Sequence, residues 1–310
     1  MAGSRHVTFS GHETFTFRYG WLKKGVDGVH GDPLIFTRDD ATTRLGVGKN
    51  MVKSVRHWCL KLGLIEESPA GLRVSDWGSR LLAGDPYIED PSSLWLLHWN
   101  LVSGPEAPTT WYWVFNEFRG HEFSKRQLVQ GLHQISESRG NGRSTTNTIK
   151  RDVDCFIRTY VATAGRGKSL EESLDCPLVE LELVHAVEDG EAYRFTVRPN
   201  STLSDAVLGF CVADYWSRRG QGKAIPETLP LEELCYGVGS PGRAFRLSES
   251  DILNRAERLA RRFGDLYHFA DTSGLKQLSL RAKPGDIRKA LLAEVLNCVD
   301  HDLREQREAS

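Results

Sequence analysis

A short N-terminal string, residues 9–24, contains several side chains that could act together on a phosphate group. His12 and Glu13 are adjacent and could serve as a general base and as a metal or proton partner. Arg18 and Lys23 could neutralise phosphate oxygens. We predict these four residues as catalytic. The alternative is structural: a strand and turn that packs its aromatic side chains and pairs Glu13 with Arg18.

A second polar set lies on one face of a helix that is expected to begin near Lys49. Lys49, Asn50, Lys53 and Arg56 form this face directly after a glycine-rich turn. Such a helix suits the major groove of DNA, where Asn and Arg read base edges and Lys contacts phosphate. We therefore predict the four as DNA-binding, with a solvated helix face as the alternative. The opposite, apolar stripe is expected to consist of Met51, Val55, Trp58, Cys59 and Leu62.

The elements around this helix predict how it is positioned. Asp39 or Asp40 can cap a short helix that reaches Leu45, and the glycines of residues 46–48 make the turn. After Gly63, two short apolar segments flank a Pro/Gly turn and predict a hairpin. Helix, turn, helix and hairpin is the order of a winged helix-turn-helix.

The same pattern recurs 98 residues further along, where Ile149 takes the place of Met51. Residues 123–132 are expected to form a first helix and residues 139–143 a Gly/Arg-rich loop, with Ser144 or Thr145 capping the second helix. The predicted stripe of that helix is Ile149, Val153, Phe156, Ile157 and Tyr160. The predicted DNA contacts are Arg143, Lys150 and Arg151.

A third candidate unit begins near Leu229, with helices expected at 231–236 and 248–263 and a hairpin at 266–280. The C-terminal helix is expected to serve packing or homodimer formation. We expect three segments, 1–118, 119–225 and 226–310. The first carries the N-terminal motif, a winged helix and aromatic-rich helices, the second a winged helix with a long hairpin, and the third a winged helix with the C-terminal helix. The predicted fold class is mainly α with small antiparallel β-hairpins (α+β), built from tandem winged helix-turn-helix units.

The overall charge conceals a strong local asymmetry. Forty Lys and Arg against 41 Asp and Glu give a net charge of −1, which excludes a uniformly cationic coat protein. Residues 38–61 nevertheless carry an excess of +4 and residues 123–168 an excess of +6, whereas residues 171–191 contain eight acids and no Lys or Arg. The positive charge therefore coincides with the two predicted DNA-binding segments.

Other chemistries find little support in the sequence. No Walker loop, dinucleotide fingerprint, serine-hydrolase elbow or zinc-protease motif occurs, and the six cysteines form no C-x-x-C pair, so buried thiols are expected. No apolar stretch is long enough for a membrane span and no signal peptide is recognisable, which predicts a cytoplasmic protein. An aromatic run could stack on unpaired bases, although core packing is favoured: Trp95, Trp99, Trp111, Tyr112, Trp113 and Phe115.

The chain resembles a bacterial phage-defence family labelled as a domain of unknown function, in the strings SGHETFTFRYGWLKK, LGVGKNMVKSVRHWCLKLGLI and ADTSGLKQLSL. The resemblance spans nearly the whole chain. It implies the role of the DNA-nicking B component of the Ssp DNA phosphorothioation system. Cysteine desulfurase, ATPase and ATP-pyrophosphatase components are then the implied partners, and no catalytic residue is carried over.

Two functions remain open at this point. In the first, winged-helix units bind double-stranded DNA and a site near His12 and Glu13 cuts one strand with a divalent metal such as Mg²⁺, which frees that strand for sulfur insertion. In the second, the protein is a non-catalytic regulator, or a scaffold that recruits the modification enzymes. Both predict DNA binding without a nucleotide or organic cofactor and without a membrane partner.

Overall fold

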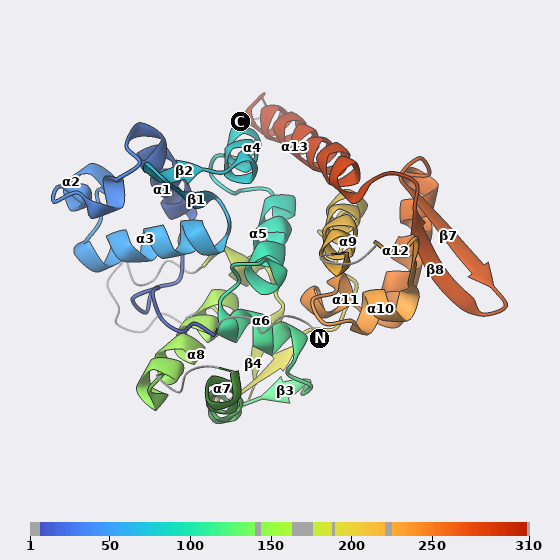
Figure 1. The fold of residues 1–310 in the computed structure, drawn as a ribbon, viewed down its shortest axis with the longest axis horizontal. Coiled ribbons are helices and arrows are strands. Elements are labelled where there is room, and N and C mark those ends of the chain that lie inside the picture. The colour runs from blue at the N-terminus through green and yellow to red at the C-terminus, as the bar shows by residue number, and fades with distance from the viewer. Residues whose placement is uncertain (1–6, 140–143, 163–175, 188–189, 221–224, 309–310) are drawn as a thin grey trace. The chain divides into compact units, whose positions relative to one another are not determined.

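The computed structural model describes residues 7–139, 144–162, 176–187, 190–220 and 225–308, with side chains up to residue 296 (Figure 1). The chain divides into two compact units: unit 1 comprises residues 1–88 and 100–196, and unit 2 comprises residues 89–99 and 197–310. Helix α5 (Pro91–Ser103) contributes residues to both. The expected boundary after residue 118 lies inside unit 1 and the one after residue 225 inside unit 2, and both stay predictions.

The first part of unit 1 is organised around helix α3, which begins at Lys49 as predicted. The turn before it is made by Gly46 in the left-handed conformation, φ 61°. Val52 is buried in α3, whereas Met51 is only half-buried, so the predicted stripe was wrong by one residue at its start. The elements here are α1 (Tyr19–Gly31), η1 (Ile35–Thr37), α2 (Ala41–Leu45), α3 (Lys49–Lys61), β1 (Ile65–Ser68), β2 (Gly71–Val74) and α4 (Asp76–Gly84).

The second part of unit 1 repeats the order helix, helix, hairpin, with an added short strand. Thr145 caps α8 by accepting a hydrogen bond from the Thr148 amide, as predicted. All five residues of the predicted α8 stripe are buried. The elements here are α6 (Thr109–Asn116), β3 (Glu122–Phe123), α7 (Lys125–Arg139), α8 (Thr146–Tyr160), η2 (Pro177–Leu181), β4 (Val184–Val187) and β5 (Ala192–Phe195).

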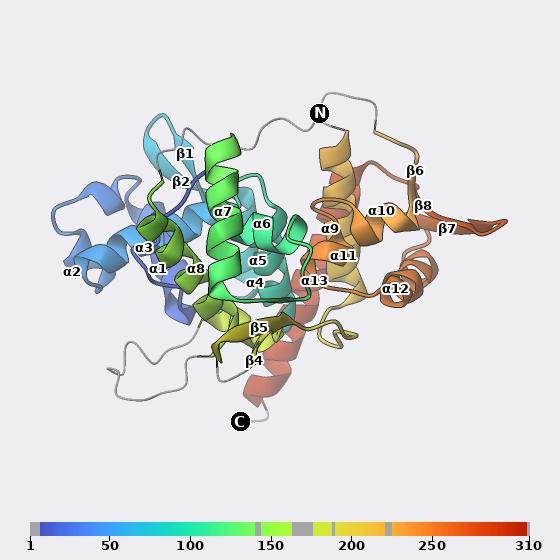
Figure 2. The same cartoon turned by 90° about the horizontal axis from the view of Figure 1, so that it is seen from below.

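Unit 2 contains the third such arrangement (Figure 2). Ser248 begins α12 with a capping box shared with Asp251, and the buried face of this helix includes Ile252, Ala256 and Leu259. The elements are α9 (Asp205–Arg219), β6 (Thr228–Pro230), α10 (Leu231–Tyr236), α11 (Pro241–Ala244), α12 (Glu249–Arg262), β7 (Tyr267–Thr272), β8 (Leu275–Leu280) and α13 (Pro284–Glu308).

Two of the three arrangements share one strand topology, and the first has a two-stranded version of it. In two of them a short strand precedes the helices and pairs with the second strand of the hairpin, giving the antiparallel orders β3-β5-β4 and β6-β8-β7. In the first, β1 and β2 form the hairpin, and the Leu72 amide donates to the carbonyl of Pro33 at 2.9 Å, in the position that β3 and β6 occupy. The structure confirms the mainly α class with small antiparallel sheets.

Aromatic side chains form much of the core of each unit. In unit 1, the rings of Trp58 and Trp111 lie 5.4 Å apart between centroids, and Phe156 contacts Trp111. Trp95, Trp99, Trp111 and Phe115 are fully buried, which confirms core packing for these members of the aromatic run. The five cysteines whose side chains are described are all buried as free thiols, as expected. Across the described residues, no helix is long and apolar enough to cross a membrane.

Candidate nucleic-acid interface

The segment before α1 runs between α3 and α8 and bonds to both helices (Figure 1). The carbonyl of Phe15 accepts a hydrogen bond from the Trp58 indole of α3 at 2.9 Å and another from the Cys155 thiol of α8 at 3.4 Å. Arg158 of α8 donates to the neighbouring carbonyl of Thr14 at 2.5 Å. We call residues 8–18 the brace, because this segment links the two helices that carry the predicted DNA contacts.

The brace bends sharply over a few residues. Ser10, Gly11, Glu13 and Thr14 all have positive φ, between 48° and 95°. At Gly11 a Cβ would lie 2.6 Å from the Nδ1 atom of His57, so both backbone conformation and space require glycine there. Three residues with side chains adopt the left-handed region nearby, which costs free energy that the surrounding bonds must offset.

Asp152 of α8 is the buried anchor of the brace. Its side chain is 2% exposed, and its Oδ1 atom accepts hydrogen bonds from the Ser10 amide and from His12 Nε2, both at 2.8 Å. The Oδ2 atom accepts from the Thr110 hydroxyl at 2.5 Å. A buried carboxylate is tolerated only when such donors surround it.

His12 is bonded through both ring nitrogens. The Thr14 amide donates to Nδ1 at 3.1 Å, so Nδ1 bears the lone pair and Nε2 carries the proton donated to Asp152. The ring packs against Trp58 and Trp111, and the residue is 2% exposed. Next to it, burial lowers the pKa of His57 to about 3, and the cations Lys61 and Arg56 add to the effect. His12 is therefore part of the core of unit 1, and His57 packs beside it.

The structure separates the four predicted catalytic residues. His12 lies in the core, whereas Glu13 is half-exposed and forms an ion pair with Lys53 of α3 at 3.3 Å. Arg18 lies over the ring of Trp21, and Lys23 pairs with Asp27 one turn further along α1. Glu13 thus pairs with Lys53, where the structural alternative expected Arg18. A catalytic role for the four stays a prediction.

The predicted DNA-binding face of α3 lies at the surface. Lys49, Asn50 and Lys53 are exposed, and the side chain of Arg56 is 41% exposed. Lys53 pairs with Glu13 and Arg56 with Glu67 of β1, so the brace and the hairpin each hold one of these cations. For Lys49, the described part of the chain provides no ion-pair partner. This arrangement leaves a positively charged helix face next to the brace.

The matching face of α8 is also exposed. Lys150 and Arg151 lie on its solvent side, opposite the stripe that packs on the core. No ion-pair partner for either occurs within the described ranges. Arg143 lies outside the described residues. Because Glu13 contacts Lys53 and the adjacent Thr14 contacts Arg158, the basic faces of α3 and α8 flank the same short stretch of the brace.

The corresponding helix of unit 2 uses its arginines differently. Arg255 is buried and donates to the carbonyls of Asn200 and Leu203, both at 2.7 Å. Arg258 pairs with Asp205, and Arg262 with Glu294. The three arginines of α12 therefore serve mainly contacts within unit 2.

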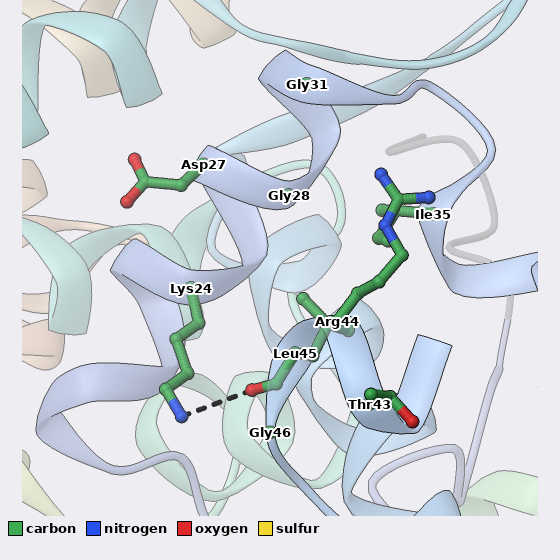
Figure 3. A pocket seen from close by; sticks show the side chains of 9 residues that line it. All are labelled: Lys24, Asp27, Gly28, Gly31, Ile35, Thr43, Arg44, Leu45 and Gly46. Carbon is green, nitrogen blue, oxygen red and sulfur yellow. Dashed lines mark hydrogen bonds between the residues drawn. The ribbon is translucent and has the colours of Figure 1, made fainter. Parts of the chain in front are cut away.

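A pocket of about 500 Å³ lies between α1 and α2 in unit 1 (Figure 3). Lys24 reaches across it and donates to the carbonyl of Leu45 at 3.2 Å. Arg44 is held by Asp32, whose carboxylate also binds Arg38. Since these cations already have partners and Asp27 adds a carboxylate to the lining, the pocket is poorly suited to an anion.

Sequence reasoning missed the anchor of the brace. Asp152 lies three residues after Ile149 and four before Phe156, so its position falls on the apolar side of α8. A single acidic residue on the buried face of a helix needs a hydrogen-bond partner, and this requirement was the sign of such a contact that the sequence offered. The partner, His12, is separated from it by 140 residues, and no local pattern predicts that contact.

Comparison with known proteins identifies relatives of the whole chain. The family model described as protein of unknown function, DUF4007, matches residues 9–296. A magnesium ion-bound SspB crystal structure is 30% identical with a TM-score of 0.85, and the match covers 95% of this chain and 89% of that one. A further SspB crystal structure gives 30% identity, the same coverage and a TM-score of 0.83. The search among curated proteins gave no significant match. The chain therefore belongs to the DUF4007 family of proteins of unknown function and is a relative of SspB.

Proposed function

We propose that this chain is the DNA-binding component of an Ssp-type DNA phosphorothioation system. The observation that carries the proposal is the brace, which joins two helices whose exposed faces bear Lys49, Lys53, Lys150 and Arg151. Likeness to SspB over nearly the whole chain supports the assignment to this system. Desulfurase, ATPase and ATP-pyrophosphatase components are its proposed partners.

The proposed mode of binding is that of tandem winged helices. In such units the second helix enters the major groove and the hairpin contacts the flanking backbone. The order strand, two helices and hairpin, with the first strand bonded to the last, supports this reading in two arrangements, and in the first arrangement the Leu72–Pro33 hydrogen bond takes the place of the strand pairing. The exposed cations of α3 and α8 favour the two arrangements of unit 1 as the DNA-binding ones, since the arginines of α12 are largely engaged within unit 2.

Binding is tested by titrating a labelled duplex with the protein at several salt concentrations. Each phosphate contact contributes about 0.9 to the slope of log affinity against log salt. Replacing Lys53 and Arg56 by Ala should weaken binding and lower that slope by up to about two. A slope equal to that of the wild type would remove both residues from the interface.

Nicking of one strand is the further step of the proposal. SspB has been crystallised with magnesium, and Mg²⁺ is the metal proposed for this chain. In the described part of the chain, no group of three or more His, Cys, Asp or Glu side chains could hold a metal, so we assign no ligand and derive no metal-dependent step. The test is conversion of supercoiled plasmid to open circle, with Mg²⁺ and with chelator.

Glu13, whose side chain is 34% exposed, is the predicted catalytic residue that pairs with the exposed face of α3, and it allows a direct comparison of variants. If Glu13 takes part in cleavage, Glu13→Ala and Glu13→Gln both lose nicking while DNA binding is retained or strengthened, because a carboxylate next to Lys53 is removed. Full nicking by both variants would refute the assignment. Lys23→Ala is the companion variant, since Lys23 pairs only within α1 among its described contacts.

A non-catalytic regulator or scaffold is the second candidate. The observation that favours it is the environment of His12, whose two ring nitrogens are bonded to Asp152 and Thr14 in the core. A purified protein that shifts duplex DNA and leaves supercoiled plasmid intact under all metal conditions would select this function.

A further inference from the structure

A small pocket opens at the surface of unit 1 where the brace meets α7 and α8. It has a volume of about 390 Å³ and is lined by Thr14, Lys125, Arg151, Asp154 and Arg158. Three of these side chains are cations and one is a carboxylate. Arg151 and Arg158 lie two turns apart on one side of α8, and Lys125 is the first residue of α7. The positive end of the α7 helix dipole therefore adds to the charge.

Two of the three cations of this pocket, Arg158 and Lys125, are held in place by the protein. Arg158 donates from Nη2 to the carbonyl of Thr14 at 2.5 Å and from Nε to the carbonyl of Asp154 at 3.2 Å. These bonds use two of the five N–H donors of the guanidinium and fix the orientation of the others. Lys125 is held by Asp154 at 2.6 Å. An ordered arginine loses less conformational entropy when it binds a ligand than a mobile one does.

We propose that this pocket binds one phosphate of the DNA backbone through Arg151, Arg158 and Lys125, an inference that rests on the proposed DNA-binding function. Planar guanidinium groups match the oxygens of a phosphate, and lysine adds a point charge. The pocket adjoins the α3 face, because Thr14 in its wall follows Glu13, the partner of Lys53. A backbone phosphate seated here positions the duplex and leaves base recognition to other residues.

Asp154 opposes this binding in a way that can be measured. Its carboxylate lies among the cations that would hold the phosphate, repels an anion and engages Lys125. Asp154→Asn should therefore strengthen DNA binding, whereas Lys125→Ala should weaken it. If the ion pair were purely structural, both variants would change DNA affinity in the same direction, because either substitution breaks the pair.

The size of the effect follows from counterion release. Loss of one phosphate contact lowers the salt slope by about 0.9, which corresponds to about 15-fold weaker binding at 50 mM salt and about 5-fold at 150 mM. We expect this loss for Lys125→Ala and a gain of at least twofold for Asp154→Asn. Both side chains are about half-exposed, at 47% and 49%, so neither substitution should impair folding. Arg158→Ala should weaken binding further, because it also releases the Thr14 carbonyl.

The matched control is the ion pair between Arg80 and Asp76 on α4, whose side chains are 45% and 84% exposed. Arg80→Ala and Asp76→Asn should leave affinity and slope unchanged. If the wild type binds duplex DNA and the Lys125 and Asp154 variants behave like these controls, the phosphate pocket is refuted and the proposed function stands. If the wild type fails to bind duplex DNA at any salt concentration, both are refuted.

Discussion

Replacement of the buried carboxylate of Asp152 tests whether the brace organises the interface. Asp152→Ala leaves three donors without their acceptor: the buried His12 Nε2 and Thr110 hydroxyl, and the part-buried Ser10 amide. Each buried donor left unsatisfied costs about 1–3 kcal/mol, so the two buried donors together cost about 2–6 kcal/mol. Because domains are stable by about 5–15 kcal/mol, this loss is a large part of the stability of unit 1.

A series of substitutions with graded effects tests the size of this loss of stability. Thr110→Val removes one hydrogen bond to the carboxylate and keeps the shape of the side chain, so it should cost about 1.5–3 kcal/mol. Asp152→Asn keeps an acceptor and should fall between the two. The free energy of unfolding is measured by urea denaturation, followed by the fluorescence of tryptophans that include Trp58 and Trp111 next to His12.

The decisive readout is DNA affinity under conditions in which the variant is folded. Loss of a negative charge would by itself strengthen binding to DNA. The brace predicts the opposite, since α3 and α8 lose their common support. We expect Asp152→Ala to bind at least about fivefold more weakly at 150 mM salt, the equivalent of one phosphate contact.

Asp214 of unit 2 provides a matched control. It accepts hydrogen bonds from Trp99, Arg218 and Arg288, at 2.5 to 2.8 Å. Asp214→Ala should reduce the stability of unit 2 and leave DNA affinity unchanged. If Asp152→Ala is as stable as the wild type, or is destabilised yet binds DNA equally well, the role that we assign to the brace is wrong.

Three further outcomes follow from individual residues. Gly11→Ala should lower the melting temperature, since it imposes a positive φ of 95° on a side chain whose Cβ would lie 2.6 Å from His57. Burial lowers the pKa of His57 from 6.5 to about 3, so between these two pH values only the unfolded chain takes up this proton. The free energy of unfolding should therefore fall by up to about 1.4 kcal/mol for each unit by which the pH is lowered in that range. His57→Gln should make this decline shallower, as measured by urea titrations. Arg255→Ala should destabilise unit 2 in thermal unfolding and leave the salt slope of DNA binding unchanged, because its bonds are to Asn200 and Leu203.

Local patterns predicted the elements of this fold well where the signal is itself local. The glycines before Lys49 gave the start of α3, and the turns between β1 and β2 and between β7 and β8 lie where Gly and polar residues interrupt apolar segments. The strands β3 and β6 were missed, because two or three residues carry no periodicity and their pairing depends on hairpins more than 45 residues away.

The sequence indicated the exposed cations of the candidate interface, but it did not indicate the brace that links the two helices. Exposed cations on α3 and α8 follow from helical spacing alone. The contacts of the brace join residues 40 to 144 positions apart, from Lys53–Glu13 to Arg158–Thr14, and such pairs are set by packing. For the same reason the sequence grouped His12 with Glu13 as neighbours, whereas the bend of the brace directs one into the core and the other toward Lys53.

The salt dependence of duplex binding tests the central claim most directly. The variant replaces Lys49, Lys53, Lys150 and Arg151 by Ala, four exposed residues from α3 and α8. Fluorescence anisotropy with a labelled duplex should show a slope of log affinity against log salt that is smaller than the wild-type slope by about 3.6. An equal slope and affinity for variant and wild type would contradict the assignment of these two helices to DNA.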